Sequence, residues 1–293
     1  MVEYLFQQNE ISKATFRKGS HLKILDLNGA QGVEADLLDH QSLHEAAEGT
    51  DTIFSMASPM PGDGEDFEGV NNRGLRNLVE VAQEMRVKTV VHLSTIDVYG
   101  FGKGEVSSES VPSPGDDYQR AKLDGERILT DFASRSPQPR IVLVRAARAV
   151  GSRDESLVIP LLRMIKKGRV TVPRGSVMSF THPKDIAQAM YKASVNPVNT
   201  GGTFLVKSFD AEVGALVGSL SRAVGADAEV RKAGVFSRTE LPEYATRQLN
   251  ASLRFAPQTN WDSLGYAPAF DLQSTCMEIA QWYKRESWVT ESS

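Results

Sequence analysis

The chain has 293 residues, of which 41% are hydrophobic and 24% charged, which fits one large domain or two closely joined ones. These values exclude a disordered, collagen-like or coiled-coil protein. The one cysteine, Cys276, excludes an internal disulfide and a cysteine-only metal cluster, and the five histidines show no metal-ligand spacing, so we expect no metal site.

The net charge of −4 comes without a basic stripe, so nucleic acid is not an expected partner. No apolar run approaches the roughly 20 residues of a membrane span. The N-terminal stretch Met1–Gln8 is too short and too polar for a signal peptide. We therefore expect a cytoplasmic protein without a membrane partner.

Strand and helix patterns alternate along the first half of the chain. Buried parallel strands read as near-continuous apolar runs, and Thr52–Ala57 and Lys88–Thr95 are such runs. A stretch rich in Gly, Ser and Pro, Phe101–Asp117, indicates a loop. The other predicted segments are a helix tail at Val2–Gln8, strands at Ser12–Arg17, Gly32–Leu38 and Arg140–Arg145, and helices at Gln41–Glu48, Asn72–Met85 and Tyr118–Phe132.

This alternation predicts an α/β fold with a doubly wound parallel sheet. After Gly151 the pattern breaks, which predicts a smaller C-terminal cap that binds substrate. We expect a dinucleotide-type domain over 1–151 and a cap over 152–293, with 180–207 returning to the sheet. The segments predicted there are helices at Leu157–Lys167, Asp185–Ser194, Val213–Val224 and Leu272–Arg285, and strands at Val170–Val172 and Thr203–Val206.

Three residues suit proton transfer coupled to hydride transfer. Thr95 ends a buried strand, where open α/β sheets bind ligands. Tyr118 and Lys122 lie four residues apart at the start of a helix and so share one face. A nearby ammonium favours the phenolate and should lower the pKa of Tyr118 from its usual value near 10. The Thr95 hydroxyl would hold a substrate oxygen while Tyr118 exchanges the proton. A Tyr-x-x-x-Lys pair also occurs on helices by chance, as an exposed aromatic and a solvated lysine.

The order of these and other motifs resembles the extended short-chain dehydrogenase/reductase family, of the NAD(P)-dependent epimerase/dehydratase type. The resemblance implies a Rossmann-like fold, Thr95 and Tyr118 as catalytic residues, and Lys122 as both catalytic and ribose-binding. Further motifs that carry it are Asp36-Leu-Leu-Asp39, Ala57-Ser58-Pro59, Asn71 with Gly74, Ser94 to Gly100, Val144-Arg145 with Gly151, Phe180 to Asp185, and Leu264 to Pro268.

The resemblance also implies a set of cofactor-binding residues. Asp36 and Leu37 would meet the adenine, and Ala57, Ser58 and Asn71 would lie beside the pyrophosphate and ribose. Arg148 falls in the loop expected to face the nicotinamide, although it also reads as a surface charge.

One family landmark is missing, namely the first strand and its Gly-x-x-Gly-x-x-Gly turn, which holds the pyrophosphate at a helix N-terminus. Gly29-Ala-Gln-Gly32 is a poor substitute, because it precedes a predicted strand rather than a helix. We expect that the reading frame starts late or that the chain is truncated. Such a chain should bind a dinucleotide poorly, and its sheet should lack the central strand.

Basic residues favour NADP(H) over NAD. Arg17 and Lys18 follow the strand at whose end NAD-preferring members place an acidic residue on the ribose diol. Basic side chains there suit a 2′-phosphate, although an exposed basic turn is the plainer reading.

The leading functional reading is an NADP(H)-dependent oxidoreductase that interconverts an alcohol and a ketone or aldehyde. Met178 stands where nucleotide-sugar members often have arginine, and Ile96-Asp97 stands where a dehydratase has Asp-Glu. The Phe54–Pro59 stretch is closer to the hydroxysteroid-dehydrogenase-like and ketone-reductase-like branches, which take apolar substrates. A nucleotide-sugar 4-epimerase with bound NAD remains a second reading, and a catalytically idle binding or structural subunit a third.

Three further expectations concern assembly and packing. The resemblance implies a homodimer in which helices Asn72–Met85 and Tyr118–Phe132 pair across a two-fold axis. Phe101, Val177, Met178 and Phe180 could line an apolar pocket, although each is more often plain packing. His182 should order a turn and Asp185 should cap the helix after it.

Overall fold

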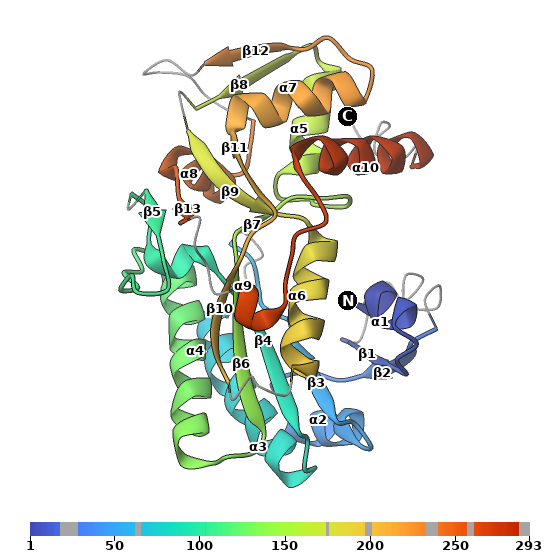
Figure 1. Cartoon of the computed structure of the whole chain (residues 1–293), viewed down its shortest axis with the longest axis vertical. Helices are drawn as coiled ribbons and strands as arrows, with labels where there is room; N and C mark the ends of the chain where they lie inside the picture. The colour runs from blue at the N-terminus through green and yellow to red at the C-terminus, as the bar shows by residue number, and fades with distance from the viewer. Residues whose placement is uncertain are drawn as a thin grey trace.

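A computed structural model describes residues 1–17, 29–61, 66–102, 104–173, 176–196, 201–232, 240–256 and 261–286. The chain has an α/β fold built on a four-stranded parallel sheet (Figure 1). The strand order is β10-β6-β4-β3, with β3 at Thr52–Ser55, β4 at Thr89–Thr95, β6 at Arg140–Ala146 and β10 at Gly202–Val206. The expected Rossmann-like fold class is therefore confirmed.

Two more parallel strands, β1 (Lys13–Phe16) and β2 (Gln31–Glu34), form a separate pair. They follow the short helix α1 (Val2–Gln7) and lie beside the main sheet, in dark blue in Figure 1. Within the described residues, β1 pairs with β2 and β3 pairs with β4, and no ladder joins β1 to β3. In the part of the chain that the structure describes, β1 and β2 are therefore a separate sheet from the four-stranded one.

Helices cover both faces of the main sheet. One face packs on α2 (His40–Ala47), α3 (Leu75–Glu84) and α4 (Asp117–Arg135), with Val90, Ile141 and Leu143 in the shared core. The other face packs on α6 (Pro183–Val195) and α9 (Trp261–Leu264), with Val91, Val142 and Val144 in the core. Because successive strand residues point to opposite faces, these alternate positions of β4 and β6 explain why both runs are apolar throughout.

Helix α4 is fixed tightly, and it carries two of the candidate residues. The Asp116 side chain accepts a hydrogen bond from the Gln119 amide and caps the helix. A Cβ on Gly125 would lie 2.7 Å from Leu75 Cδ1, so glycine permits the close approach to α3. Glu126, on α4, accepts two hydrogen bonds of 2.9 and 2.5 Å from Arg145 of β6; the Glu126 side chain is buried and that of Arg145 is 11% exposed. These contacts set the position of α4 along the sheet.

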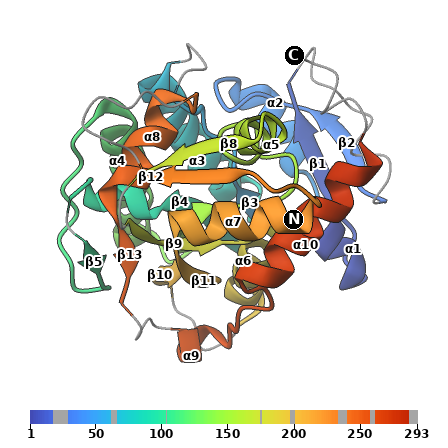
Figure 2. The same cartoon turned by 90° about the horizontal axis from the view of Figure 1, so that it is seen from above.

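The C-terminal part forms a second layer above the strand ends, seen from above in Figure 2. It contains two small sheets, β8–β12 and β7-β9-β11, and the helices α5, α7, α8 and α10. A large apolar core of residues from Val150 to Trp282 holds it together, and Met178 and Phe180 belong to that core. The bounds are β7 Arg148–Ala149, α5 Val158–Lys166, β8 Arg169–Val172, β9 Val177–Thr181, β11 Phe209–Glu212, α7 Val213–Ala223, β12 Glu229–Lys232, α8 Glu243–Ala251 and α10 Leu272–Arg285.

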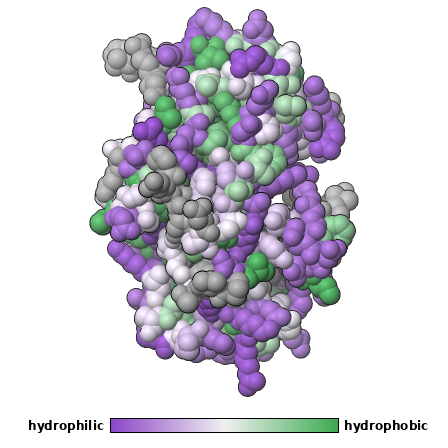
Figure 3. Space-filling view, viewed as in Figure 1, coloured by the Kyte–Doolittle hydropathy of each residue, from purple (hydrophilic) through white to green (hydrophobic). Residues whose placement is uncertain are grey.

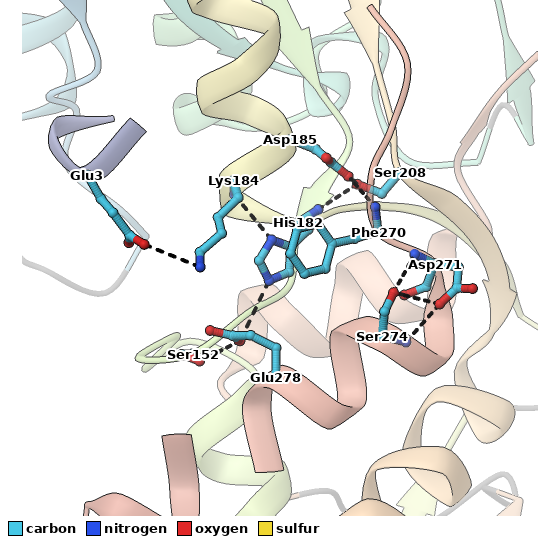
Figure 4. Close-up of polar contacts among 10 residues, drawn as sticks. All are labelled: Glu3, Ser152, His182, Lys184, Asp185, Ser208, Phe270, Asp271, Ser274 and Glu278. Atoms are coloured by element: carbon cyan, nitrogen blue, oxygen red, sulfur yellow. Dashed lines mark hydrogen bonds and ion pairs between the residues drawn. The ribbon is translucent and has the colours of Figure 1, made fainter. Parts of the chain in front are cut away.

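A polar cluster joins α6, the strand ends and α10 (Figure 4). The His182 ring stacks on Phe270 at 3.7 Å, and its Nδ1 accepts the Lys184 amide, so His182 caps α6. The expectation that Asp185 is the cap is wrong, because its carboxylate accepts the backbone amides of Ala269 and Phe270 instead. His182 does order the turn, as predicted.

Several segments differ from the sequence-based expectation. The loop 101–117 contains a short strand, β5 (Glu105–Val106), which pairs with β13 (Arg254–Phe255) from the far end of the chain. The helix expected at Asn72–Met85 begins as the wider η3 turn (Gly69–Gly74) and continues as α3. The strands β9, β11 and β12 and the helix α8 were not expected, since their sequences are short and carry mixed polarity.

The face in Figure 3 is mostly hydrophilic, with small separate apolar patches. Over the described ranges, we find no helix with the length and apolar character needed to cross a membrane. The same residues contain no group of side chains suited to holding a metal ion.

Candidate functional site

Most of the candidate residues lie at the carboxyl ends of the parallel strands. Arg17 follows β1, Asp36 follows β2, Ala57 follows β3, Thr95 ends β4, and Arg148 comes two residues after β6. Parallel strands bring their carboxyl ends to one edge, which is where open α/β sheets bind ligands. Lys18 lies outside the described residues.

Thr95 is half-buried at the end of β4, where it pairs in register with Ala146 of β6. Its Oγ1 accepts the Asp97 amide at 3.1 Å and so begins the short η4 turn (Ile96–Tyr99). Because Oγ1 accepts this bond, the Thr95 hydroxyl hydrogen is left to donate to a ligand oxygen.

Tyr118 lies in the first turn of α4, and its side chain is only 8% exposed. Its ring meets Phe67 edge-on at 5.8 Å and Tyr244 of α8 at 5.3 Å. Its hydroxyl faces the sulfur of Met60 at 3.9 Å, in the segment that follows β3. Burial, and secondly the Asp97 carboxylate, raise the pKa of Tyr118 well above its usual value.

Lys122 lies one helical turn further along α4 and is 4% exposed. Its Nζ donates to the backbone oxygen of Leu93 at 3.0 Å, two residues before Thr95. Burial lowers the pKa of Lys122 to about 8, and Glu126 opposes this shift. The expectation that Lys122 lowers the pKa of Tyr118 is not met here, because burial and carboxylates dominate at the phenol.

The expected cofactor residues form a connected group. The Ser58 hydroxyl donates to Asn71 Oδ1 at 3.1 Å, which links the end of β3 to η3. The Leu37 oxygen accepts Asn77 Nδ2 at 3.0 Å, and Gly74 lies against the Leu37 side chain. Asp36 shapes its own turn by accepting the Leu38 amide at 2.8 Å.

The chemistry of this group fits part of a dinucleotide site. Lys122 has donors to spare for ribose hydroxyls, and Ser58 and Asn71 are polar neighbours at the strand ends. The glycine turn that would hold the pyrophosphate fits a dinucleotide less well than these residues do. The turn at Gly29, with φ of +67°, leads into strand β2 rather than into a helix, so it offers no helix N-terminus for a phosphate.

Arg148 is buried rather than a surface charge. Its Nη2 lies 3.2 Å from Asp154 Oδ2 and 2.6 Å from Ser156 Oγ, while its buried Nε has no hydrogen-bond partner. Met178 and Phe180 are packed in the C-terminal core, so they are not candidates for a pocket wall. Phe101 lies 5.6 Å from the Tyr244 ring and therefore borders the site.

Sequence reasoning missed a second polar group above Thr95. Asp97 is buried, and its Oδ2 accepts the Tyr244 hydroxyl at 2.9 Å and Gln248 Nε2 at 2.6 Å. Asp97 stood in the sequence as a departure from the dehydratase pattern. A carboxylate two residues past the end of a buried strand was the signal that could have drawn attention to it.

The comparisons with known proteins identify the family of this chain. Residues 1–206 match the NAD dependent epimerase/dehydratase family, so the chain belongs to that family. It is accordingly an enzyme of the NAD(P)-dependent oxidoreductase and epimerase kind.

Two curated relatives have names that refer to sterols. The chain is 26% identical to sterol demethylase protein B of Methylococcus capsulatus, over 77% of this chain and 70% of that protein. It is 30% identical to a decarboxylating sterol-4-alpha-carboxylate 3-dehydrogenase of Candida albicans, over 56% of this chain and 49% of that protein. A protein of Sinorhizobium fredii named y4nG is 24% identical over 94% of this chain and 75% of its own length.

Solved structures share the fold. The UDP-glucose 4-epimerase of Bifidobacterium longum, in complex with NAD+ and UDP, superposes with a TM-score of 0.77 at 15% identity, covering 97% of this chain and 94% of that one. RMD of Pseudomonas aeruginosa, complexed with NADPH, gives 0.70 at 18% identity, covering 94% of this chain and 99% of that one.

Proposed function

We propose that this protein is an NADP(H)-dependent oxidoreductase that interconverts an alcohol and a ketone or aldehyde, with Tyr118 as the acid/base. The observation that carries the proposal is the hydrogen bond from Lys122 Nζ to the Leu93 oxygen of β4, two residues before Thr95, with Tyr118 one helical turn before Lys122 on α4. Membership of the NAD dependent epimerase/dehydratase family supports the class of reaction.

Each residue has one task in this proposal. The Thr95 hydroxyl donates to the substrate oxygen and orients it. Tyr118 gives that oxygen its proton in reduction and takes it back in oxidation. Lys122 binds ribose hydroxyls with the donors that its hydrogen bond to the Leu93 oxygen leaves available. A nicotinamide bound there would supply or accept the hydride.

The groups around Tyr118 favour an apolar substrate. Met60, Phe67 and Tyr244 contact its side chain, and Phe101 lies beyond Tyr244. Aromatic and thioether side chains offer apolar surface against which an apolar ring can pack. The relatives whose names refer to sterols also favour an apolar substrate. A hydrophobic alcohol or ketone is therefore the proposed substrate class.

A nucleotide-sugar 4-epimerase is the second candidate, favoured by the overall likeness to epimerase structures. It would use the same Thr95, Tyr118 and Lys122 with tightly held NAD. Against it, the position where sugar-nucleotide members often have arginine is Met178, which is buried in the C-terminal core. A catalytically idle subunit is the third candidate, and its site would have no need of all three side chains.

Substitution of the three residues tests the proposal. Tyr118→Phe keeps the ring contacts and removes the proton, so turnover should fall by about 10²- to 10⁴-fold. Thr95→Ser should keep much activity and Thr95→Val little, because only the hydroxyl acts. The measurement is NADPH oxidation by the full chain against a panel of ketones and aldehydes, after cofactor binding has been titrated. A Tyr118→Phe variant with normal turnover would show that the site lies elsewhere.

A further inference from the structure

Asp97 is a buried carboxylate that the proposed chemistry does not use. It is 3% exposed, and its backbone amide donates to Thr95 Oγ1 at 3.1 Å. Its Oδ2 accepts two hydrogen bonds, from the Tyr244 hydroxyl and from Gln248 Nε2. Both donors are neutral, whereas a buried carboxylate is unfavourable unless it is well compensated. Such a cost suggests that this residue has a task beyond packing.

Helix α8 connects Asp97 to Tyr118. The Tyr244 ring that binds Asp97 also meets the Tyr118 ring edge-on, at 5.3 Å and 78°. One turn later, Arg247 forms an ion pair at 3.0 Å with Asp116, the residue that caps α4. Helix α8 is therefore attached both to the turn after Thr95 and to the helix that carries Tyr118.

We propose that Asp97 is a positioning residue of the site, which holds Tyr244 against Tyr118 and places a fixed negative charge beside the phenol. The geometry gives it two links to the proposed chemistry, through its amide to Thr95 and through Tyr244 to Tyr118. Tyr244 then forms a wall of the substrate site, placed there by a hydrogen bond from the sheet domain.

The consequence is that Tyr118 rests as a phenol and is poised to donate a proton, as reduction of a carbonyl requires. The charged groups around it come from several elements. Asp97 of η4 and Asp116 before α4 oppose the phenolate, and Arg148 of β7 favours it. Lys122 of α4 is turned to the Leu93 oxygen, and Arg247 of α8 is paired with Asp116. Burial acts in the same direction as the two carboxylates.

The substitution Asp97→Asn removes the negative charge of residue 97 but keeps the size of the side chain. Both hydrogen bonds go to one oxygen, so the amide oxygen of asparagine can accept them in its place. The measurement is an alkaline titration of the full chain labelled with ¹³C at tyrosine Cζ, without cofactor, with the Tyr118 signal assigned by its loss in Tyr118→Phe. We expect the Tyr118 phenolate fraction, compared at the highest pH at which both proteins are folded, to be larger in Asp97→Asn than in the wild type.

Two further variants serve as controls. Asp51→Asn removes the same charge from an exposed residue before β3, paired with Lys88, and should leave the Tyr118 titration unchanged. Tyr244→Phe keeps the ring and removes the hydroxyl, so it should increase the exchange-broadening of the Tyr118 signal while the Asp97 charge stays. Far-UV circular dichroism at each pH establishes that every variant is folded.

Equal phenolate fractions in the wild type and Asp97→Asn at every pH would overturn the inference. A loss of fold in Asp97→Asn together with an unchanged Tyr118 signal in Tyr244→Phe would make Asp97 a structural residue only, and would overturn it too. This inference deepens the proposed function, but its titration needs neither cofactor nor activity. Failure of the enzyme assay with a shifted titration would therefore count against the proposed function alone.

Discussion

At the scale of single residues, Lys122 should make the stability of the protein depend on pH in an unusual direction. Burial lowers the pKa of Lys122 in the folded state to about 8, from its ordinary value of 10.5. Between these pH values the unfolded chain binds more protons than the folded one, so the free energy of unfolding rises with pH. Below pH 8, where Lys122 is charged in both states, burial of its ammonium lowers the free energy of unfolding by the full amount, about 3 kcal/mol.

Lys122→Met should therefore be more stable than the wild type at pH 7, and the difference should shrink as the pH rises from 8 to 10.5. Urea denaturation at several pH values measures both, and the difference between the two proteins isolates Lys122 from other titrating groups. A constant difference across this range would mean that Lys122 does not titrate there.

Arg17 is a second residue whose role can be measured directly. It is exposed at the end of β1, next to the turn that contains Asp36. Arg17→Asp should weaken NADPH binding much more than NADH binding, because it removes a charge-assisted contact worth about 1.5–3 kcal/mol. Fluorescence titration with both cofactors is the test, and equal losses would contradict the NADP(H) preference.

At the scale of elements, the attachment of α4 to the sheet depends on a buried ion pair. Arg145 is held by both Glu126 oxygens and by the Tyr99 hydroxyl at 2.7 Å. Glu126→Gln should lower the free energy of unfolding by about 3–5 kcal/mol, because it leaves a buried guanidinium without its charge partner.

The matched control lies on the same helix. Arg127 and Asp124 form an exposed pair, three residues apart, at 2.8 Å. Asp124→Asn should change stability by less than about 1 kcal/mol, because solvent screens exposed pairs. Chemical denaturation of both variants gives the comparison, and equal costs would show that burial does not decide the strength of these pairs.

At the scale of the whole molecule, the predicted homodimer would pair α3 and α4 across a two-fold axis. In this protein the outer faces of those helices expose charged residues, among them Arg76, Glu80, Arg120 and Arg127. Such a dimer would depend on charge complementarity, so we expect it at micromolar concentration and low salt, with weaker association at high salt. Sedimentation velocity at two salt concentrations is the measurement, and a monomer throughout would refute the prediction.

The candidate site shows what a single sequence can predict. Thr95, Tyr118 and Lys122 could be identified because a strand end and a four-residue helical spacing place them by local rules alone. Asp97 and Tyr244 are 147 residues apart and meet only because α8 folds back over the end of β4. The rise in the pKa of Tyr118 has the same origin, since it comes from burial and from charges that several elements bring together.

For the fold as a whole, the parallel sheet and the bounds of α10 could be predicted from the sequence, because apolar runs and helix caps are local signals. Only the tertiary structure decided that β5 pairs with β13, that His182 rather than Asp185 caps α6, and that Met178 lies in a core. Short segments of mixed polarity acquire their pairing and burial from distant partners, and no local pattern encodes those partners.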